Sequence, residues 1–363
     1  LHPRVRRQRQ MCIRDRLKVA EKSGITAVLA KALRPLFRKI MPEVPADSPA
    51  MGSMIMNIAA NVLGLDNAAT PMGLKAMEQL QTLNPHKDRA SDAQILFMVI
   101  NSSAVTLIPI TILMYRSELG AANPSAIFMP ILFATSLSTL AGFLAVAVVQ
   151  RLNVFNRVVM AYLGGFILFI GVVAFYFCSL PETERLSVSA NCGNFLLFAV
   201  IVAFIGAGVV KKLNVYETFV VGAKEGFEIA VRIIPYLVAM LVAIAVFRAS
   251  GALDFLVDGF AAVFGWLGID TGFVAALPTA LLKPLSGSGA RAMMIETMTT
   301  YGADSFPAFV SAVVQGSTET TFYVLAVYFG AVKITKVGAA LPCALFADFV
   351  GIASAICFSY LFY

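Results

Sequence analysis

The sequence has little charge and far more apolar residues than a soluble protein can bury. Only 13% of the 363 residues are charged, 59% are apolar, and the mean hydropathy is +0.81. A soluble domain cannot cover its surface with so few charged side chains. The composition therefore excludes a soluble globular protein and indicates a chain that is solvated by lipid.

Residue types that form metal and catalytic centres are also scarce. The chain has two histidines and five cysteines, with no CxxC spacing. Zinc sites and histidine-dependent triads need such clusters. We therefore expect no metal site, no cofactor and no enzymatic activity, since Glu319 and Asp348 are the only candidate acids within apolar segments.

The formal charge of +7 does not indicate a nucleic-acid partner. Residues 1–16 hold six Arg and one Asp, which account for +5 of the total. This tail has neither the apolar core of a signal peptide nor the pattern of a transit peptide. Two explanations stay open: the tail is not native sequence, or it is a polybasic segment that contacts anionic lipid beside the membrane.

Long apolar runs dominate the rest of the chain. A membrane-crossing helix needs about 20 largely apolar residues, and backbone groups that face lipid must be paired within the helix. Membrane lipid is therefore the expected surrounding, in an all-α polytopic protein. The runs that predict transmembrane helices are 92–116, 125–150, 158–180, 194–210, 229–247, 306–329 and 337–361.

Loop charges predict how the chain crosses the bilayer. The loops 151–157 and 211–232 are basic, whereas the loop 181–193 between them has one Arg and two Glu. Cytoplasmic loops carry the excess of Lys and Arg. This places 17–90 on the cytoplasmic side and 248–305 on the outer side.

Four sequence blocks of the first half recur in the same order in the second half. The pair VINSSAVTLIPITILMY (99–115) and VVQGSTETTFYVLAVYF (313–329) aligns without gaps. Together with the opposite loop charges, this predicts two inverted repeats, as in many secondary transporters. The second half begins with a helix at 216–247 that has no counterpart in the first, so we expect that the N-terminal transmembrane helix is missing from this chain.

Each half also contains a polar segment that should break a helix. The segment LGLDNAATPMGLK (63–75) includes Pro71, and proline costs about 3 kcal/mol in a helix interior. It corresponds to LKPLSGSGARAMMIET (282–297), where N–H groups at a helix start would favour an anion or a carbonyl oxygen. Asn57 and Asn61 are one turn apart, and their amides suit a neutral polar solute. The alternative is that these amides tie broken helix ends together.

Glu319 gives the sharpest single signal, because a carboxylate inside an apolar helix is costly and faces a cavity or a partner. Val105 stands at the aligned position of the first half. Glu319 could bind a proton, a sodium ion or a substrate hydroxyl. The alternative is a buried salt bridge to Lys283 or Arg291, and Asp348 has the same interpretation.

The two breaks and their polar neighbours are predicted to line one cavity near the middle of the bilayer. No catalytic residue is expected among them. The candidate substrate-binding residues are Asn57, Asn61, Asn67, Thr70, Asn101, Ser102, Ser286, Ser288, Arg291, Gln315, Ser317, Thr318, Glu319 and Thr320.

Three stretches resemble the spore maturation A and B family, fused here in one chain. They are NIAANVLGLDNAATPMGLKAM (57–77) for the A type, and SGSGARAMM (286–294) and QGSTETTFYVLAVYFGAV (315–332) for the B type. The resemblance covers about 17–363 and implies two nucleoside recognition (Gate) domains, a module also found in nucleoside and ferrous iron transport proteins. Members of the A type begin with a transmembrane helix, which agrees with the helix that we expect to be missing.

The expected protein is a multi-pass protein of the bacterial cytoplasmic (inner) membrane that transports or gates a small polar solute such as a nucleoside. The alternative is a non-transporting membrane factor that acts in spore or envelope maturation through partner binding. A homo-oligomer is left open. The predicted division is an Arg-rich tail (1–16), a first repeat (17–150), linking helices (151–215) and a second repeat (216–363).

Overall fold

The computed structural model describes residues 25–363 except 46, 64–65 and most of 211–240, and the side chains of 25–30 and 66–68 are also outside this set. The expectations about the Arg-rich tail and about the chain before residue 25 therefore lie outside the described residues. So do residues 229–230, 232–237 and 240 of the predicted helix 229–247.

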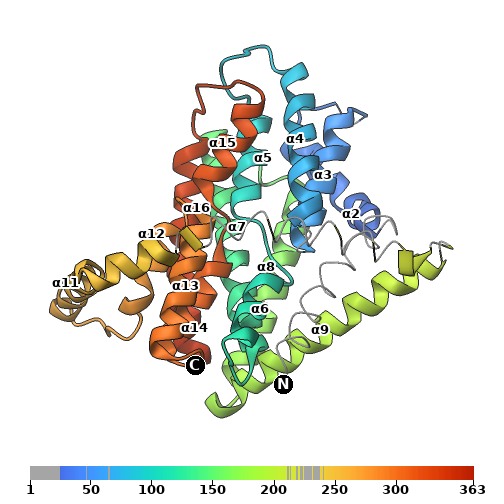
Figure 1. The fold of residues 1–363 in the computed structure, drawn as a ribbon. Coiled ribbons are helices and arrows are strands. Elements are labelled where there is room, and N and C mark those ends of the chain that lie inside the picture. The colour runs from blue at the N-terminus through green and yellow to red at the C-terminus, as the bar shows by residue number, and fades with distance from the viewer. Residues whose placement is uncertain are drawn as a thin grey trace.

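Helices account for all the regular structure in the described part of the chain, which confirms the all-α class (Figure 1). An isolated bridge between Arg89 and Lys336 is the one strand-like pairing within it. The elements are α2 (Ile25–Ile40), α3 (Pro49–Val62), α4 (Asp66–Leu83), α5 (Asp92–Ser102), α6 (Ile110–Glu118), η1 (Pro124–Ile127), α7 (Phe128–Val149), α8 (Arg157–Ser179), α9 (Glu182–Val210), α11 (Ala252–Trp266), η2 (Val274–Ala276), α12 (Leu277–Leu282), α13 (Gly287–Tyr301), α14 (Phe306–Ser317), α15 (Thr321–Ala331) and α16 (Ala340–Phe362).

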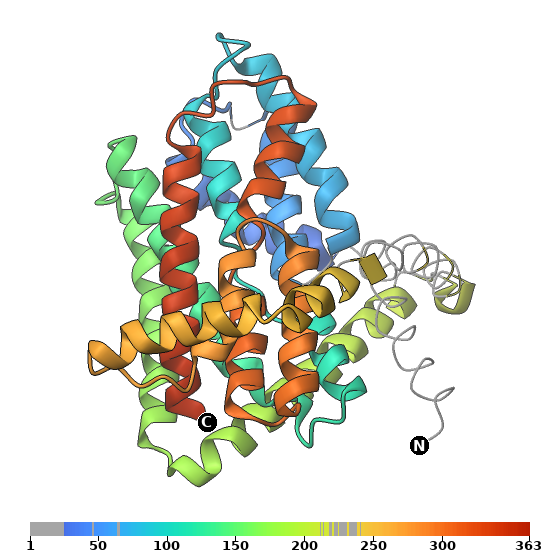
Figure 2. The ribbon, with the colours of Figure 1, turned by 60° about the vertical axis from the view of Figure 1, so that its left-hand side comes forward.

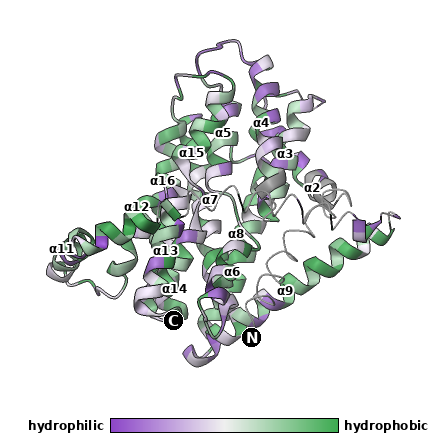
Figure 3. Ribbon diagram, in the orientation of Figure 1, coloured by the Kyte–Doolittle hydropathy of each residue, from purple (hydrophilic) through white to green (hydrophobic). Residues whose placement is uncertain are grey.

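Four helical segments of the described chain are long and apolar enough to cross a bilayer: Pro124–Val149, Arg157–Ser179, Glu182–Val210 and Ala340–Phe362. Only 6% of the apolar window of α8 is buried, against 61% for the segment that contains α7. Figure 3 shows the hydrophobic colour along most of α9. The outer helices therefore present apolar surface to lipid, as a polytopic membrane protein requires, while α7 belongs to the interior.

The predicted loop 181–193 is wrong over nearly all its length, because α9 already begins at Glu182. Its first turn carries Glu182 and Glu184. Carboxylates are favourable at the positive end of the helix dipole, so the polar loop signal was in fact a helix start.

The predicted helices 92–116 and 306–329 are also wrong as continuous spans, since each is a pair of half-helices. In the first, Pro109 lacks an N–H donor and disfavours a helical residue before it, so α6 starts only at Ile110. In the second, Thr318 is extended, with φ −147° and ψ 172°. The broken helices expected for the repeats are thus present at 103–109 and 318–320.

The two broken helices run in opposite directions. The N–H of Ala90, just before α5, donates to the carbonyl of Lys336, just after α15, at 3.0 Å. At the other end, the N–H of Ala122, after α6, donates to Asp304 Oδ2, before α14, at 2.8 Å. The start of each broken helix therefore meets the end of the other, which confirms the inverted repeat.

Each repeat also contains a helical hairpin whose tip meets its own break (Figure 2). The N–H of Leu107 donates to the carbonyl of Val62, at the α3–α4 tip, at 3.1 Å. The N–H of Phe322 donates to the carbonyl of Pro284, at the α12–α13 tip, at 3.0 Å. The same contact thus occurs in both halves, with the hairpins entering from opposite ends of the bundle.

Two apolar cores fill the two ends of the bundle. One contains Phe97 and Phe329, and the other contains Phe133 and Phe309. Buried polar residues of α7 and α16 occupy the level between these cores, and burial of unpaired polar groups is unfavourable in an apolar interior. The fold therefore concentrates its polar interior where the four half-helices meet; this layer includes Thr135, Ser136, Ser138 and Asp348.

Candidate functional site

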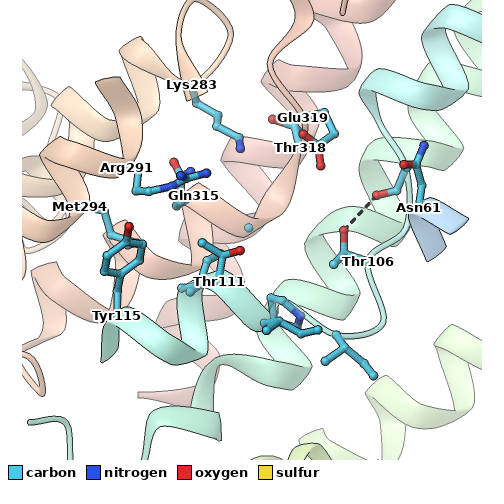
Figure 4. A pocket seen from close by; sticks show the side chains of 16 residues that line it. Asn61, Thr106, Thr111, Tyr115, Lys283, Arg291, Met294, Gln315, Thr318 and Glu319 are labelled. Atoms are coloured by element: carbon cyan, nitrogen blue, oxygen red, sulfur yellow. Dashed lines mark hydrogen bonds between the residues drawn. The ribbon is translucent and has the colours of Figure 1, made fainter. Parts of the chain in front are cut away.

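Two neighbouring cavities lie where the broken helices meet. The Arg291 cavity has a volume of about 120 Å³, and it is bounded by the first break, α6, α14 and the α12–α13 hairpin (Figure 4). Its polar lining residues are Asn61, Thr106, Thr111, Tyr115, Lys283, Arg291, Gln315, Thr318 and Glu319.

The Tyr328 cavity has a volume of about 180 Å³ and lies among α3, α4, α5 and α15. Asn61 and Glu319 line both cavities. These two residues therefore stand at the junction between the cavities, and each comes from a different half of the chain. The Tyr328 cavity is lined by Asn61, Thr70, Asn101, Glu319, Tyr323, Val324, Val327 and Tyr328.

Glu319 lies in the break between α14 and α15, not in the middle of a helix as the sequence predicted. Its side chain is exposed, whereas the flanking residues Thr318 and Thr320 are buried. Its backbone N–H donates to the carbonyl of Ser102 at 2.8 Å. A backbone contact with the other half therefore holds this carboxylate at the junction of the two cavities.

The Arg291 cavity contains polar atoms that lack a protein partner. Arg291 Nε and Gln315 Oε1 are both buried without a hydrogen-bond partner. Both side chains line the same cavity (Figure 4). An unpaired buried donor and an unpaired buried acceptor are costly unless a ligand or water completes them. This arrangement favours a polar ligand with its own donor and acceptor.

The amide of Asn101 connects α3, α5 and α15. Asn61 Nδ2 donates to Asn101 Oδ1 at 2.7 Å, and the Tyr328 hydroxyl donates to the same oxygen at 3.5 Å. Asn101 Nδ2 in turn donates to the carbonyl of Phe97 at 2.9 Å. This network fixes the orientation of Asn61 at the junction of the two cavities.

Asn57 has the structural role that the sequence offered as the alternative. It is fully buried, and its Nδ2 donates to the carbonyl of Ala69 at 2.7 Å and to the Tyr328 hydroxyl at 3.2 Å. A Cβ at Gly73 would overlap the Tyr328 hydroxyl, so glycine permits this close approach of α4 to α15. Asn57 thus ties the first hairpin together and joins it to the second half.

The candidate serines bond within their own helices and do not line the cavities described above. The hydroxyls of Ser102 and Ser317 donate to the carbonyls of Val99 and Val314, at 3.0 Å and 2.8 Å. Short hydroxyl side chains readily make such local bonds.

The serines of the second hairpin cap the helix that follows it. Ser286 Oγ accepts the N–H of Gly289 at 3.1 Å and lies 3.3 Å from Ser288 Oγ. Part of the helix start expected to bind an anion is therefore already satisfied. Thr320 packs against Gly287, where a Cβ would lie 2.7 Å from Thr320 Oγ1.

Half of the fourteen candidate residues line the two cavities, and the side chain of Asn67 lies outside the described residues. Sequence reasoning missed Tyr115, Tyr323 and Tyr328. The available signal was weak: Val324 and Tyr328 are one helical turn apart and so share a face, but nothing marks that face as a cavity wall. The candidates that line the cavities are Asn61, Thr70, Asn101, Arg291, Gln315, Thr318 and Glu319.

Comparison with known proteins identifies the repeat unit. The family model Gate, described as nucleoside recognition, matches residues 17–122 and 230–335. In the described chain, the first match holds the α3–α4 hairpin with α5 and α6, and the second holds the α12–α13 hairpin with α14 and α15. The family unit is therefore a hairpin together with a broken helix.

Two proteins of Bacillus subtilis (strain 168) are similar to parts of the chain. Spore maturation protein B is 52% identical over 149 residues, which are 41% of this chain and 82% of that protein. Spore maturation protein A is 42% identical over 122 residues, which are 34% of this chain and 62% of that protein, so the chain covers less than two thirds of it. No solved structure matches. Because the Gate model covers more than half of the chain, and covers it twice, this multi-pass membrane protein belongs to the nucleoside recognition (Gate) family.

Proposed function

We propose that this protein passes a small polar solute of the nucleoside class across the bacterial cytoplasmic membrane. The observation that carries the proposal is the junction of the two cavities at Asn61 and Glu319, between the two inverted repeats. Transporters built from inverted repeats bind their solutes between discontinuous helices near the bilayer midplane. The family description, nucleoside recognition, supports this class of solute.

The polar groups around the junction suit the parts of a nucleoside. A ribose offers hydroxyls to the Glu319 carboxylate, and a base edge offers a donor and an acceptor to Gln315 Oε1 and Arg291 Nε. The rings of Tyr323 and Tyr328 supply aromatic surface in the second cavity.

The cavity volumes limit how such a solute is held. Pockets for drug-sized ligands measure about 300–1,000 Å³, which is more than either cavity offers. A nucleoside therefore needs both cavities, or the movement of a hairpin that enlarges one of them.

The distribution of charged residues between the two ends of the bundle supports one orientation of the protein in the membrane. Loops at the end where Ala90 meets Lys336 carry mostly basic residues, whereas Asp304 and Glu182 lie toward the other end. We assign the basic end to the cytoplasm by the distribution of Lys and Arg. The α3–α4 hairpin then enters from the cytoplasm and the α12–α13 hairpin from outside.

Uptake into proteoliposomes tests the proposal. The purified chain should give saturable uptake of at least one radiolabelled nucleoside, and excess unlabelled nucleoside should compete. Glu319→Gln should reduce this uptake at least tenfold, whereas Glu78→Gln, an exposed carboxylate on α4, should not. The proposal fails if no nucleoside enters, or if Glu319→Gln transports as well as the unaltered protein.

A second candidate is the non-transporting factor that acts through a partner. Helix α11 projects from the bundle (Figures 1 and 2), and Phe255 and Trp266 on it are 78% and 85% exposed. Cellular function that is lost with Trp266→Ala, but kept with Glu319→Gln and Arg291→Ala, would favour this candidate over transport.

A further inference from the structure

Helix α2 has a basic face that points away from the bundle. The helix contains four basic residues and no acidic one. Lys31, Arg34 and Arg38 follow one another at spacings of three and four residues, so they share one face, and Lys39 lies beside it. All four side chains are exposed.

The opposite face of α2 is apolar and fixed to the protein. Phe37 and Ile40 are 3% and 4% exposed and belong to the core cluster that contains Phe97, and Leu33 and Leu36 pack against the same cluster. Apolar residues at this spacing form the buried stripe of an amphipathic helix. Amphipathic helices with Lys and Arg on the polar face lie at the boundary between lipid headgroups and acyl chains.

The position of α2 in the fold suits that boundary. Figure 1 shows α2 almost end-on beside the upright helices α3 and α4, so α2 crosses the direction of the bundle. The Tyr162 hydroxyl donates to the carbonyl of Ala32 at 2.6 Å. Since α8 begins at Arg157, this contact lies about 8 Å along α8 from its start. Interfacial helices bury their apolar face to a depth of about 5–10 Å.

Acidic residues of the chain do not neutralise the basic face. Arg34 Nη2 lies 3.6 Å from Asp47 Oδ1, but these side chains are 51% and 97% exposed, so solvent weakens the pair. Lys31, Arg38 and Lys39 form no ion pair with any other residue that the structure describes. The face therefore has an excess of positive charge that an external anion can balance.

The equivalent helix of the second repeat has the opposite charge. Helix α11 precedes the α12–α13 hairpin as α2 precedes the α3–α4 hairpin, but it carries Asp254 and Asp258 and no basic residue. The repeat fold therefore does not itself require a basic helix at this position. Clusters of Lys and Arg beside a membrane attract anionic lipids, and the guanidinium group matches the geometry of a phosphate.

We propose that the basic face of α2 binds the headgroups of anionic phospholipids at the membrane surface. Helix α2 leads through residues 41–48 into α3, so lipid bound to α2 restrains the first arm of the hairpin that carries Asn61. The lipid-binding surface does not depend on transport. An effect of the lipid on solute uptake rests on the proposed function.

Lipid titration of the purified full chain in detergent tests the surface. Phosphatidylglycerol should raise the melting temperature saturably, whereas phosphatidylcholine, which has no net charge, should not. Native mass spectrometry should show phosphatidylglycerol retained on the protein. The double variant Arg38→Gln with Lys39→Gln should need at least tenfold more phosphatidylglycerol for half of the shift in melting temperature.

A matched control removes two positive charges from the same end of the bundle. The double variant Lys87→Gln with Lys333→Gln changes exposed side chains in the loops before α5 and after α15. It should respond to phosphatidylglycerol as the unaltered protein does. Both double variants should melt near the unaltered temperature in phosphatidylcholine, because none of the four side chains is buried.

Three results would overturn the lipid-binding surface. One is an unaltered response to phosphatidylglycerol in Arg38→Gln with Lys39→Gln, since the basic face would then serve an acidic protein or only the orientation of the chain. Another is an equal loss of response in both double variants, since the total charge of this end would then attract the lipid. A third is an equal shift with inorganic phosphate or glycerol phosphate, since the face would then bind free anions.

Uptake separates this inference from the proposed function. Nucleoside uptake into proteoliposomes should increase with the fraction of phosphatidylglycerol, and it should increase less in Arg38→Gln with Lys39→Gln. Phosphatidylglycerol binding without nucleoside uptake in any lipid would retain the surface and reject the proposed function.

Discussion

The backbone N–H of Glu319 donates to the backbone carbonyl of Ser102 at 2.8 Å. Ser102 ends α5 of the first repeat, and Glu319 lies in the break of the second. Side-chain substitutions do not remove this bond, so the position of the Glu319 carboxylate depends on the backbone of the other half. Variants at Glu319 should therefore change the chemistry of the junction while the two breaks stay together.

Gly351→Ala should destabilise the protein by about 1–3 kcal/mol, because its added methyl group would collide with Thr318 and Ser138. Thermal unfolding in detergent measures the effect. Gly171→Ala is the matched control on α8, since nothing lies within 4 Å of the added Cβ. An equal loss of stability in both variants would show that the packing of the break against α16 is not responsible.

Asn61 and Asn101 should show coupled effects on stability. Removing either one leaves a buried or half-buried amide group without its partner, which costs about 1–3 kcal/mol. The double variant Asn61→Ala with Asn101→Ala should cost less than the sum of the single variants, by about 0.5–3 kcal/mol. Additive losses in a double-mutant cycle would contradict the 2.7 Å hydrogen bond between them.

Arg116→Ala should destabilise the protein much more than Asp304→Ala. Arg116 is 2% exposed, donates to the carbonyl of Ala303 at 3.1 Å and lies 5.7 Å from the ring centroid of Phe309. Loss of this large buried side chain should cost about 2–5 kcal/mol.

Asp304, the ion-pair partner of Arg116, has a half-exposed side chain, so solvent weakens that pair. Its replacement also removes the acceptor of the Ala122 N–H, and the two losses together should cost about 1–2 kcal/mol. Urea or thermal unfolding of both variants measures the difference. Equal losses of stability in the two variants would mean that the ion pair, and not the buried packing of Arg116, stabilises this end of the bundle.

Gln315→Leu should raise the KM of nucleoside uptake about tenfold, which corresponds to about 1.4 kcal/mol. The leucine keeps most of the side-chain volume but removes Oε1, the unpaired acceptor in the Arg291 cavity. Arg291→Lys should act in the same direction, because lysine keeps the charge but loses the planar guanidinium donors. Thr299→Val, an exposed position on α13, is the control, and a KM that is unchanged in Gln315→Leu would remove this residue from the solute site.

The membrane class, the repeat and its inversion could be predicted because each leaves a signal in the sequence itself. These signals are the length of the apolar runs, the order of the recurring sequence blocks and the charges of the loops. The gapless alignment placed Asn101 opposite Gln315, and both residues lie beside the breaks in the structure. The division into domains at 150 and 216 remains a prediction.

The exact breaks were not predictable because tertiary contacts determine them. Residues 318–320 leave the helix where the N–H of Glu319 bonds to Ser102, more than two hundred residues earlier in the chain. Tyr328 was missed for the same reason, since its hydroxyl partners Asn57 and Asn101 both lie in the other half. The hydroxyls of Ser102 and Ser317 donate to carbonyls of their own helices, and a sequence does not distinguish such local bonds from bonds to a ligand.

The two hairpin-tip bonds, from the N–H of Leu107 to the carbonyl of Val62 and from the N–H of Phe322 to the carbonyl of Pro284, are equivalent backbone hydrogen bonds in the two halves. Each bond joins a hairpin to the broken helix of its own half, and the hairpins enter from opposite ends of the bundle. One hairpin can therefore shift away from its broken helix while the corresponding bond of the other half stays intact.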